Sequence, residues 1–138
     1  MADVAPMNIF QVSGRAMSAQ LIRMNTTASN LANAGSVATT ADAAYKSMKP
    51  VFRTAFDSAN ALATVDVESV VSAGEAPTKR YDPGNPLADA EGNVFESAVD
   101  ETRELVDMME AARTYQNNVE VMQTAKSLIT QTLQLGRG

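Results

Sequence analysis

Apolar side chains recur with a seven-residue period from about residue 99 to residue 135, and this periodicity constrains the fold more than any other feature. From Leu105, alternate steps of three and four residues reach side chains that are apolar or aromatic, with one exception. This C-terminal stripe consists of Leu105, Met108, Ala112, Tyr115, Val119, Met122, Lys126, Ile129 and Leu133. Such spacing keeps one face of a helix against another helix. It predicts a helix roughly 55 Å long that needs a neighbour along its length.

The chemistry of its flanks marks where this helix begins and ends. Ser97 or Asp100 can cap its start, and Asp100, Glu101 and Glu104 stand where the positive end of the helix dipole favours negative charge. Gly136 predicts its end. Near Lys126, the one charged residue of the first stripe, a second apolar stripe takes over part of the apolar face. It consists of Val121, Ala125, Leu128 and Leu135. Two stripes indicate that more than one helix packs against this one.

The same seven-residue period of apolar side chains occurs near the beginning of the chain. Asn8 is a good N-cap, and Gln11 stands three residues later as in a capping box, so a helix is predicted over residues 8–35 with Gly35 at its end. The N-terminal stripe consists of Phe10, Gly14, Met17, Leu21, Met24, Ala28 and Leu31. Residues 1–7 lack periodicity and are expected to form a flexible lead-in. We expect the two helices to pack on each other within one subunit.

The N-terminal helix is unusually poor in charge. Between residues 8 and 35 the only charged side chains are Arg15 and Arg23, and the other polar positions are Ser, Thr, Asn and Gln. A solvated helix usually shows Glu and Lys on its outer face, whereas buried charges are costly. A helix surrounded by other protein is therefore favoured over an ordinary surface helix. Ser29, Asn30 and Asn33 are expected to form hydrogen bonds that only neighbouring subunits complete.

Residues 36–98 lose the helical period and are rich in turn formers. Short runs with β propensity are predicted as strands at residues 50–56, 64–72, 78–81 and 93–95, with a turn-dense loop before the last. The predicted fold class is therefore mainly α: two long terminal helices form a coiled-coil layer, and a small β-rich module is inserted between them. The expected divisions are 1–7, 8–35, 36–98 and 99–138.

Composition excludes most catalytic classes. The chain of 138 residues has no Cys and no His, which removes thiol nucleophiles, thiolate zinc sites and imidazole acid–base chemistry. Its net charge of −5 argues against a nucleic-acid partner. There is no secretory signal and no run long enough to span a membrane. No enzyme activity and no cofactor are predicted.

Four carboxylates lie in or near the turn-rich loop, as the ligands of a calcium-binding loop would. It consists of Asp82, Asp89, Glu91 and Asp100. An EF-hand loop needs glycine at its sixth position, but Gly92 stands fourth when counted from Asp89. Solvated turn residues are therefore the favoured interpretation, and no metal site is predicted.

Residues 27–34, Thr-Ala-Ser-Asn-Leu-Ala-Asn-Ala, carry a family resemblance. The segment resembles the N-terminal signature of the bacterial flagellar axial proteins, which comprise the rod, hook and hook-associated proteins. Within that family, three segments are similar to proximal rod proteins. They are the opening at 8–14, the Tyr-Asp-Pro-Gly-Asn-Pro loop at 81–92, and the ending at 112–128 with 133–136. The resemblance covers essentially the whole chain.

The resemblance implies a structural protein whose terminal helices form the coiled-coil inner layer of a tubular polymer in the flagellar basal body. Its partners would be other rod subunits and copies of itself, near the inner-membrane ring and export apparatus. It would leave the cell through the flagellar type III apparatus without a cleaved signal peptide and without inserting into the membrane. The expected assembly interface consists of Phe10, Met17, Leu21, Met24, Ser29, Asn30, Leu31, Asn33, Leu105, Met108, Tyr115, Val119, Met122, Leu128, Ile129 and Leu133.

Two other functions compete with a rod subunit. A soluble helical adaptor or chaperone-like binding protein would use the same stripes to hold a partner. Charge depletion over residues 8–35 disfavours it, because a helix that spends time in water would carry more charge. A small hydrolase lacks any set of catalytic groups.

Overall fold

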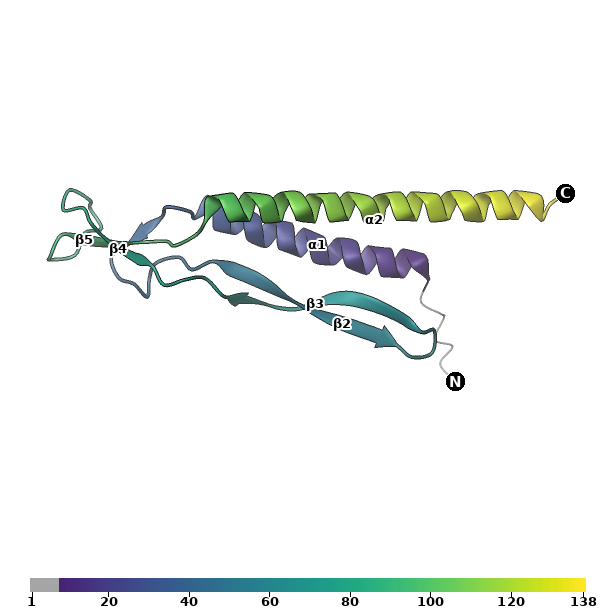
Figure 1. Cartoon of the computed structure of the whole chain (residues 1–138), viewed down its shortest axis with the longest axis horizontal. Helices are drawn as coiled ribbons and strands as arrows, with labels where there is room; N and C mark the ends of the chain where they lie inside the picture. Colours follow the sequence, from purple (N-terminus) through teal and green to yellow (C-terminus); the bar gives the residue numbers. More distant parts are fainter. Residues whose placement is uncertain (1–7) are drawn as a thin grey trace.

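The computed structural model describes residues 8–138, and it is an elongated molecule in which two long helices lie side by side along the main axis (Figure 1). The elements follow in the order α1 (Ile9–Ala32), β1 (Val37–Ala38), β2 (Met48–Asp57), β3 (Leu62–Ser72), β4 (Thr78–Tyr81), β5 (Asn93–Glu96) and α2 (Glu101–Leu135). The helices are antiparallel (Figure 1). The lead-in expected over residues 1–7 lies outside the described residues.

Local signals in the sequence determine where both helices begin. The Asn8 side chain accepts a hydrogen bond from the backbone N–H of Gln11, and the Gln11 side chain accepts one from the backbone N–H of Asn8. This confirms the predicted capping box. Asp100 caps α2 by accepting from the backbone N–H of Arg103. Glu101 and Glu104 occupy the first turn of α2, where negative charge is favourable.

Helix α1 is covered on two sides within the subunit. It lies between α2 and the hairpin formed by β2 and β3, as Figure 1 shows. Its buried residues are small or uncharged, namely Ser13, Ala19, Thr26, Thr27 and Asn30. The lack of charge on α1 is therefore explained in part by its own chain, because the hairpin occupies a face that would otherwise meet solvent.

The antiparallel strands form two sheets. Strands β2 and β3 pair along their whole length, with Phe56 opposite Ala63 and Met48 opposite Ser72, and a bulge interrupts the register between Val51 and Phe52. The other sheet has the order β1-β5-β4 and lies at the end of the molecule where α2 begins (Figure 1). Two helices with short strands between them are as predicted. The strands form two separate antiparallel sheets, and the long β2–β3 hairpin runs beside α1.

The loop between β4 and β5 folds on itself through its acidic side chains. Asp89 accepts hydrogen bonds from the backbone N–H groups of Glu91 and Asn93. Gly92 has a φ of +80°, and a Cβ at this position would lie 2.9 Å from the Tyr81 ring, so glycine is required there. Within residues 8–138, no three acidic side chains converge to form a metal site.

The subunit has very little apolar core of its own. Among the described residues, the buried hydrophobic side chains are Ala19, Ala44, Val94 and Ala111, and Val94 is the largest of them. Many larger apolar side chains stay exposed, including Phe56 on the hairpin and Leu133 on α2. Polar interactions therefore contribute much of what is specific in the packing of α1, α2 and β2.

Candidate functional site

Asn30 joins three elements through a side chain that is 0% exposed. Its Oδ1 accepts hydrogen bonds from the backbone N–H of Met48 and from the hydroxyl of Tyr45, both at 2.8 Å. Its Nδ2 donates to the carbonyl of Met48 and to Oε2 of Glu104, both at 2.9 Å. The amide thus ties the end of α1 to the start of β2 and to α2.

Glu104 extends this network from α2, and it is only 3% exposed. Its Oε1 accepts from the Lys49 ammonium at 2.7 Å and from the Ser47 hydroxyl at 3.2 Å. A buried carboxylate is tolerated only when it is paired and hydrogen-bonded. Burial raises the pKa of Tyr45, and the negative charge of Glu104 raises it further, so the Tyr45 hydroxyl remains a donor at neutral pH.

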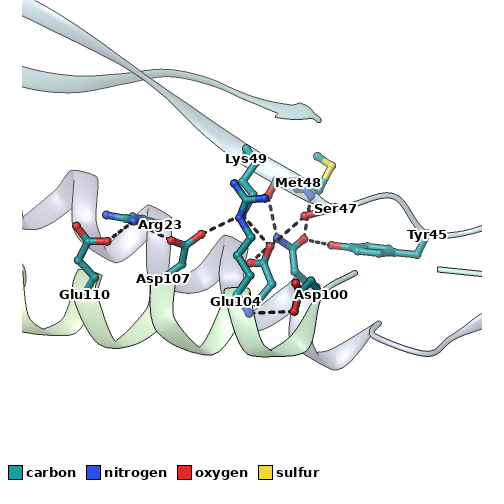
Figure 2. Close-up of polar contacts among 11 residues, drawn as sticks. Arg23, Tyr45, Ser47, Met48, Lys49, Asp100, Glu104, Asp107 and Glu110 are labelled. Atoms are coloured by element: carbon teal, nitrogen blue, oxygen red, sulfur yellow. Dashed lines mark hydrogen bonds and ion pairs between the residues drawn. The ribbon is translucent and has the colours of Figure 1, made fainter. Parts of the chain in front are cut away.

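A second carboxylate, Asp107, continues the network toward the middle of the helices (Figure 2). It pairs with Lys49 at 3.1 Å and with Arg23 at 3.2 Å, and Arg23 also pairs with Glu110 at 3.1 Å. Burial raises the pKa of Asp107, but the hydrogen bonds and charges of Lys49 and Arg23 outweigh it and leave that pKa below its ordinary value. Burial alone would lower the pKa of Lys49, but the hydrogen bonds and negative charges of Glu104 and Asp107 outweigh burial and raise that pKa above its ordinary value.

These six side chains form what we call the polar network: Arg23, Asn30, Tyr45, Lys49, Glu104 and Asp107. Of these, sequence reasoning singled out Asn30 and placed Glu104 only at the helix dipole. A signal for Glu104 exists in the sequence, because it stands four residues before Met108 and seven before Ala111, on the face that proves to be inward. No sequence signal links Tyr45 and Lys49 to that face.

The far part of α2 has no cover within the described chain. Every residue from 126 to 138 is exposed. The apolar side chains in this region include Leu128 (58% exposed), Ile129 (47%) and Leu133 (66%). Where this exposed region begins, a shallow groove runs between the start of α1 and α2, and it is lined mainly by Ile9, Val121, Ala125 and Leu128.

The expected interface residues divide between these two surroundings. Half-buried positions are Phe10, Met17, Met24, Leu31, Asn33, Met108, Tyr115, Val119 and Met122. Exposed positions are Leu21, Ser29, Leu105, Leu128, Ile129 and Leu133. The inward face of α2 recurs at Glu104, Met108, Ala111, Tyr115, Asn118, Met122 and Ala125. Met108, Tyr115 and Met122 belong both to this face and to the predicted stripe. At the other positions the inward face lies one residue before the stripe, with Glu104 in place of Leu105, so the prediction that Leu105 faces the other helix is wrong.

The prediction that the hydrogen bonds of Asn30 wait for neighbouring subunits is also wrong. All four are formed inside the subunit, because β2 starts directly against the end of α1. Asn33 donates to the Ser29 carbonyl at 2.8 Å, which is a bond within the end of α1. In the described part of the chain, neither helix combines the length and apolar character that crossing a membrane requires.

Comparison with known proteins agrees with this architecture at both ends. Residues 10–35 match the family described as "Flagella basal body rod protein". Residues 90–135 match "Flagellar basal body rod FlgEFG protein C-terminal". The two matches cover most of α1 and all of α2, which are the elements that the polar network joins.

Relatives extend the similarity over nearly the whole length. The flagellar basal-body rod protein FlgC of Salmonella typhimurium is 44% identical over 135 residues, covering 97% of this chain and 100% of the relative. FlgC of Yersinia enterocolitica is 42% identical over 95% of this chain and 98% of the relative. FlgC of Buchnera aphidicola subsp. Baizongia pistaciae is 32% identical over 94% of this chain and 97% of the relative. With two helices of rod-protein type and such coverage, the chain belongs to the FlgC family of flagellar basal-body rod proteins.

Proposed function

We propose that this chain is a structural subunit of the bacterial flagellar basal-body rod, and that its terminal helices join neighbouring subunits in a coiled-coil layer. The observation that supports this proposal most strongly is the uncovered end of α2. The names of the relatives point in the same direction. On this view the chain acts by packing and needs neither a catalytic group nor a cofactor.

Helix lengths define how much of α2 needs a partner. Helix α2 has 35 residues and α1 has 24, so at about 1.5 Å per residue α2 exceeds α1 by roughly 16 Å. Ile129 and Leu133 stand in this excess and are about half exposed or more, and Leu128, which lines the groove with Ile9, is 58% exposed. Burying such a side chain completely from water contributes about 1.5–3 kcal/mol, so covering the exposed part of each contributes roughly half of that. Neighbouring helices that cover them would therefore stabilise a polymer that the subunit alone cannot provide.

The same residues define the partners. An apolar helix face with Lys126 as its one charge in the predicted stripe fits another amphipathic helix, as rod subunits and copies of this chain would supply. We place the subunit in the rod on the side of the inner-membrane ring and export apparatus, reached by type III export without a cleaved signal peptide. Its net charge of −5 disfavours nucleic acid as a partner.

The proposal is tested by a substitution that leaves the fold intact. Leu133→Asp places a charge on a side chain that is 66% exposed, so the isolated chain should keep its helicity and its unfolding midpoint. Gln131→Asp is the matched control, because it places the same charge two residues away on an exposed polar position. Each gene is expressed in a flagellated bacterium that lacks its own copy.

We expect the Gln131→Asp chain to restore swimming and to appear in purified basal bodies, and the Leu133→Asp chain to do neither. A Leu133→Asp chain that enters basal bodies in normal amount would refute assembly through this face. A soluble adaptor gives a different result, because neither chain would then be found in the purified structure.

A further inference from the structure

The contact between α1 and α2 is built from a pattern that repeats along both helices. On the inward face of α2, Met108, Tyr115 and Met122 are seven residues apart and are all large. Between them, Ala111, Asn118 and Ala125 are also seven residues apart and are all small or short. If α2 slid along α1 by seven residues, each large side chain would therefore take the place of another large one, and each small side chain the place of another small one.

Helix α1 does not break this degeneracy by packing alone. Apart from Asn30, its buried residues are small: Ala19 and Thr26 are seven residues apart, and Ser13 and Thr27 are fourteen apart. Knobs and holes that repeat in this way stabilise several alignments almost equally. These surfaces alone therefore do not select one alignment.

We propose that Glu104 and Asp107 act as the register key of the subunit: their bonds to α1 and β2 fix the axial position of α2. Glu104 is the one member of the inward face that carries a charge, and seven residues further along that position is Ala111. Its carboxylate meets Asn30, Ser47 and Lys49 at the same time. Asp107 meets Lys49 and Arg23.

The cost of misalignment favours this assignment. After a shift of seven residues, Asn30 and Lys49 would face Ala111 in place of Glu104, and the carboxylate of Glu104 would leave its donors. Buried donors that lose their acceptor, as Asn30 would, are strongly unfavourable, whereas a well-satisfied carboxylate adds little to stability. Buried polar groups that distinguish one alignment from another are the best-attested use of such residues.

The register matters because it determines how far α2 projects past α1. A shift of seven residues moves the exposed end, including Leu128 and Leu133, by about 10 Å along the axis. The inference does not depend on the proposed function, because alignment within the subunit can be measured on the isolated chain.

The experiment compares two double variants in which the carboxylates are replaced. Glu104→Met with Asp107→Met removes the key and leaves unbranched apolar side chains. Glu104→Gln with Asp107→Asn is the control, because it keeps the shape of both side chains and one of the two accepting oxygens of each. The chain contains no native cysteine, so spin labels can be placed at exposed Ala28 on α1 and Gln123 on α2. Label-to-label distances are measured by pulsed electron resonance with the labelled chain diluted into unlabelled chain.

We expect one narrow distance distribution for the parent chain and for the amide control. For the methionine variant we expect unchanged helical circular dichroism together with a distribution that broadens or gains a second maximum about 10 Å away. A single parent-like distance in the methionine variant would overturn the proposal, because packing would then suffice. Loss of helicity in that variant would also overturn it, because the carboxylates would then supply stability in place of register. A broad distribution in the parent chain would do the same.

Discussion

Replacing Asn30 by alanine tests the structural meaning of the family signature that contains it. Four hydrogen bonds end on this fully buried amide, with donor–acceptor distances between 2.8 and 2.9 Å. Each such bond contributes about 1 kcal/mol net, and more where its partner is left unpaired. The expected loss of stability for Asn30→Ala is therefore about 4 kcal/mol.

The same signature supplies the control. Asn33 is three residues away, and its side chain donates to the Ser29 carbonyl at the end of α1. Asn33→Ala removes this one solvent-exposed bond and should cost about 0.5 kcal/mol. The two asparagines therefore differ sharply in expected effect although they belong to one motif.

The assay is urea unfolding of the purified chain followed by circular dichroism at 222 nm. With a denaturant slope of about 2 kcal/mol per molar urea, Asn30→Ala should lower the midpoint by about 2 M, and Asn33→Ala by about a tenth of that. If the two variants unfold at the same midpoint, the buried amide does not join α1, β2 and α2 in the way described.

Three further predictions follow from the network, a close contact and the helix faces. Because the pKa of Asp107 is lowered in the folded chain, it contributes stability that is present above the ordinary Asp range and is lost as the pH falls through the folded-state pKa. Because the pKa of Lys49 is raised, it contributes stability that is lost as the pH rises above the ordinary Lys range. Urea midpoints measured across pH should therefore fall at both ends of the range, and Asp107→Asn should flatten the fall on the acid side. Gly74→Ala would place a Cβ 2.6 Å from the Ser47 backbone nitrogen and should lower the free energy of unfolding by about 1–3 kcal/mol, whereas Gly84→Ala, with no atom within 4 Å, should leave the midpoint unchanged. Met122→Asp puts a charge on the inward face of α2 and should abolish swimming, whereas exposed Glu75→Gln should not; normal swimming by the first would contradict a helix–helix role for Met122.

Signals confined to a few neighbouring residues were predictable from the sequence. The capping box at Asn8 and Gln11 is observed, as are the strands expected near residues 50–56, 64–72, 78–81 and 93–95. Strand β1 was missed, because Val37–Ala38 is too short to show alternation. Both helices were predicted because their apolar period extends over many turns.

Relations between distant segments were not predictable in the same way. The face of α2 was misplaced by one residue, because apolar Leu105 was chosen over charged Glu104 and apolar character is only a proxy for burial. The sequence also gave no sign that β2 begins against the end of α1, where it meets Asn30. For that reason the charge depletion of α1 was attributed entirely to neighbouring subunits, although the hairpin accounts for part of it.

The central claim is that the end of α2 serves assembly and not the fold of the subunit. Its most direct test is the amount of a chain lacking residues 129–138 that is recovered in purified basal bodies, relative to the full chain expressed at the same level. All the deleted residues are exposed, so the shortened chain should keep the urea midpoint of the full chain. The account predicts that this folded chain is absent from the basal bodies and that the cells do not swim. Recovery of the shortened chain at the level of the full one, in swimming cells, would contradict it.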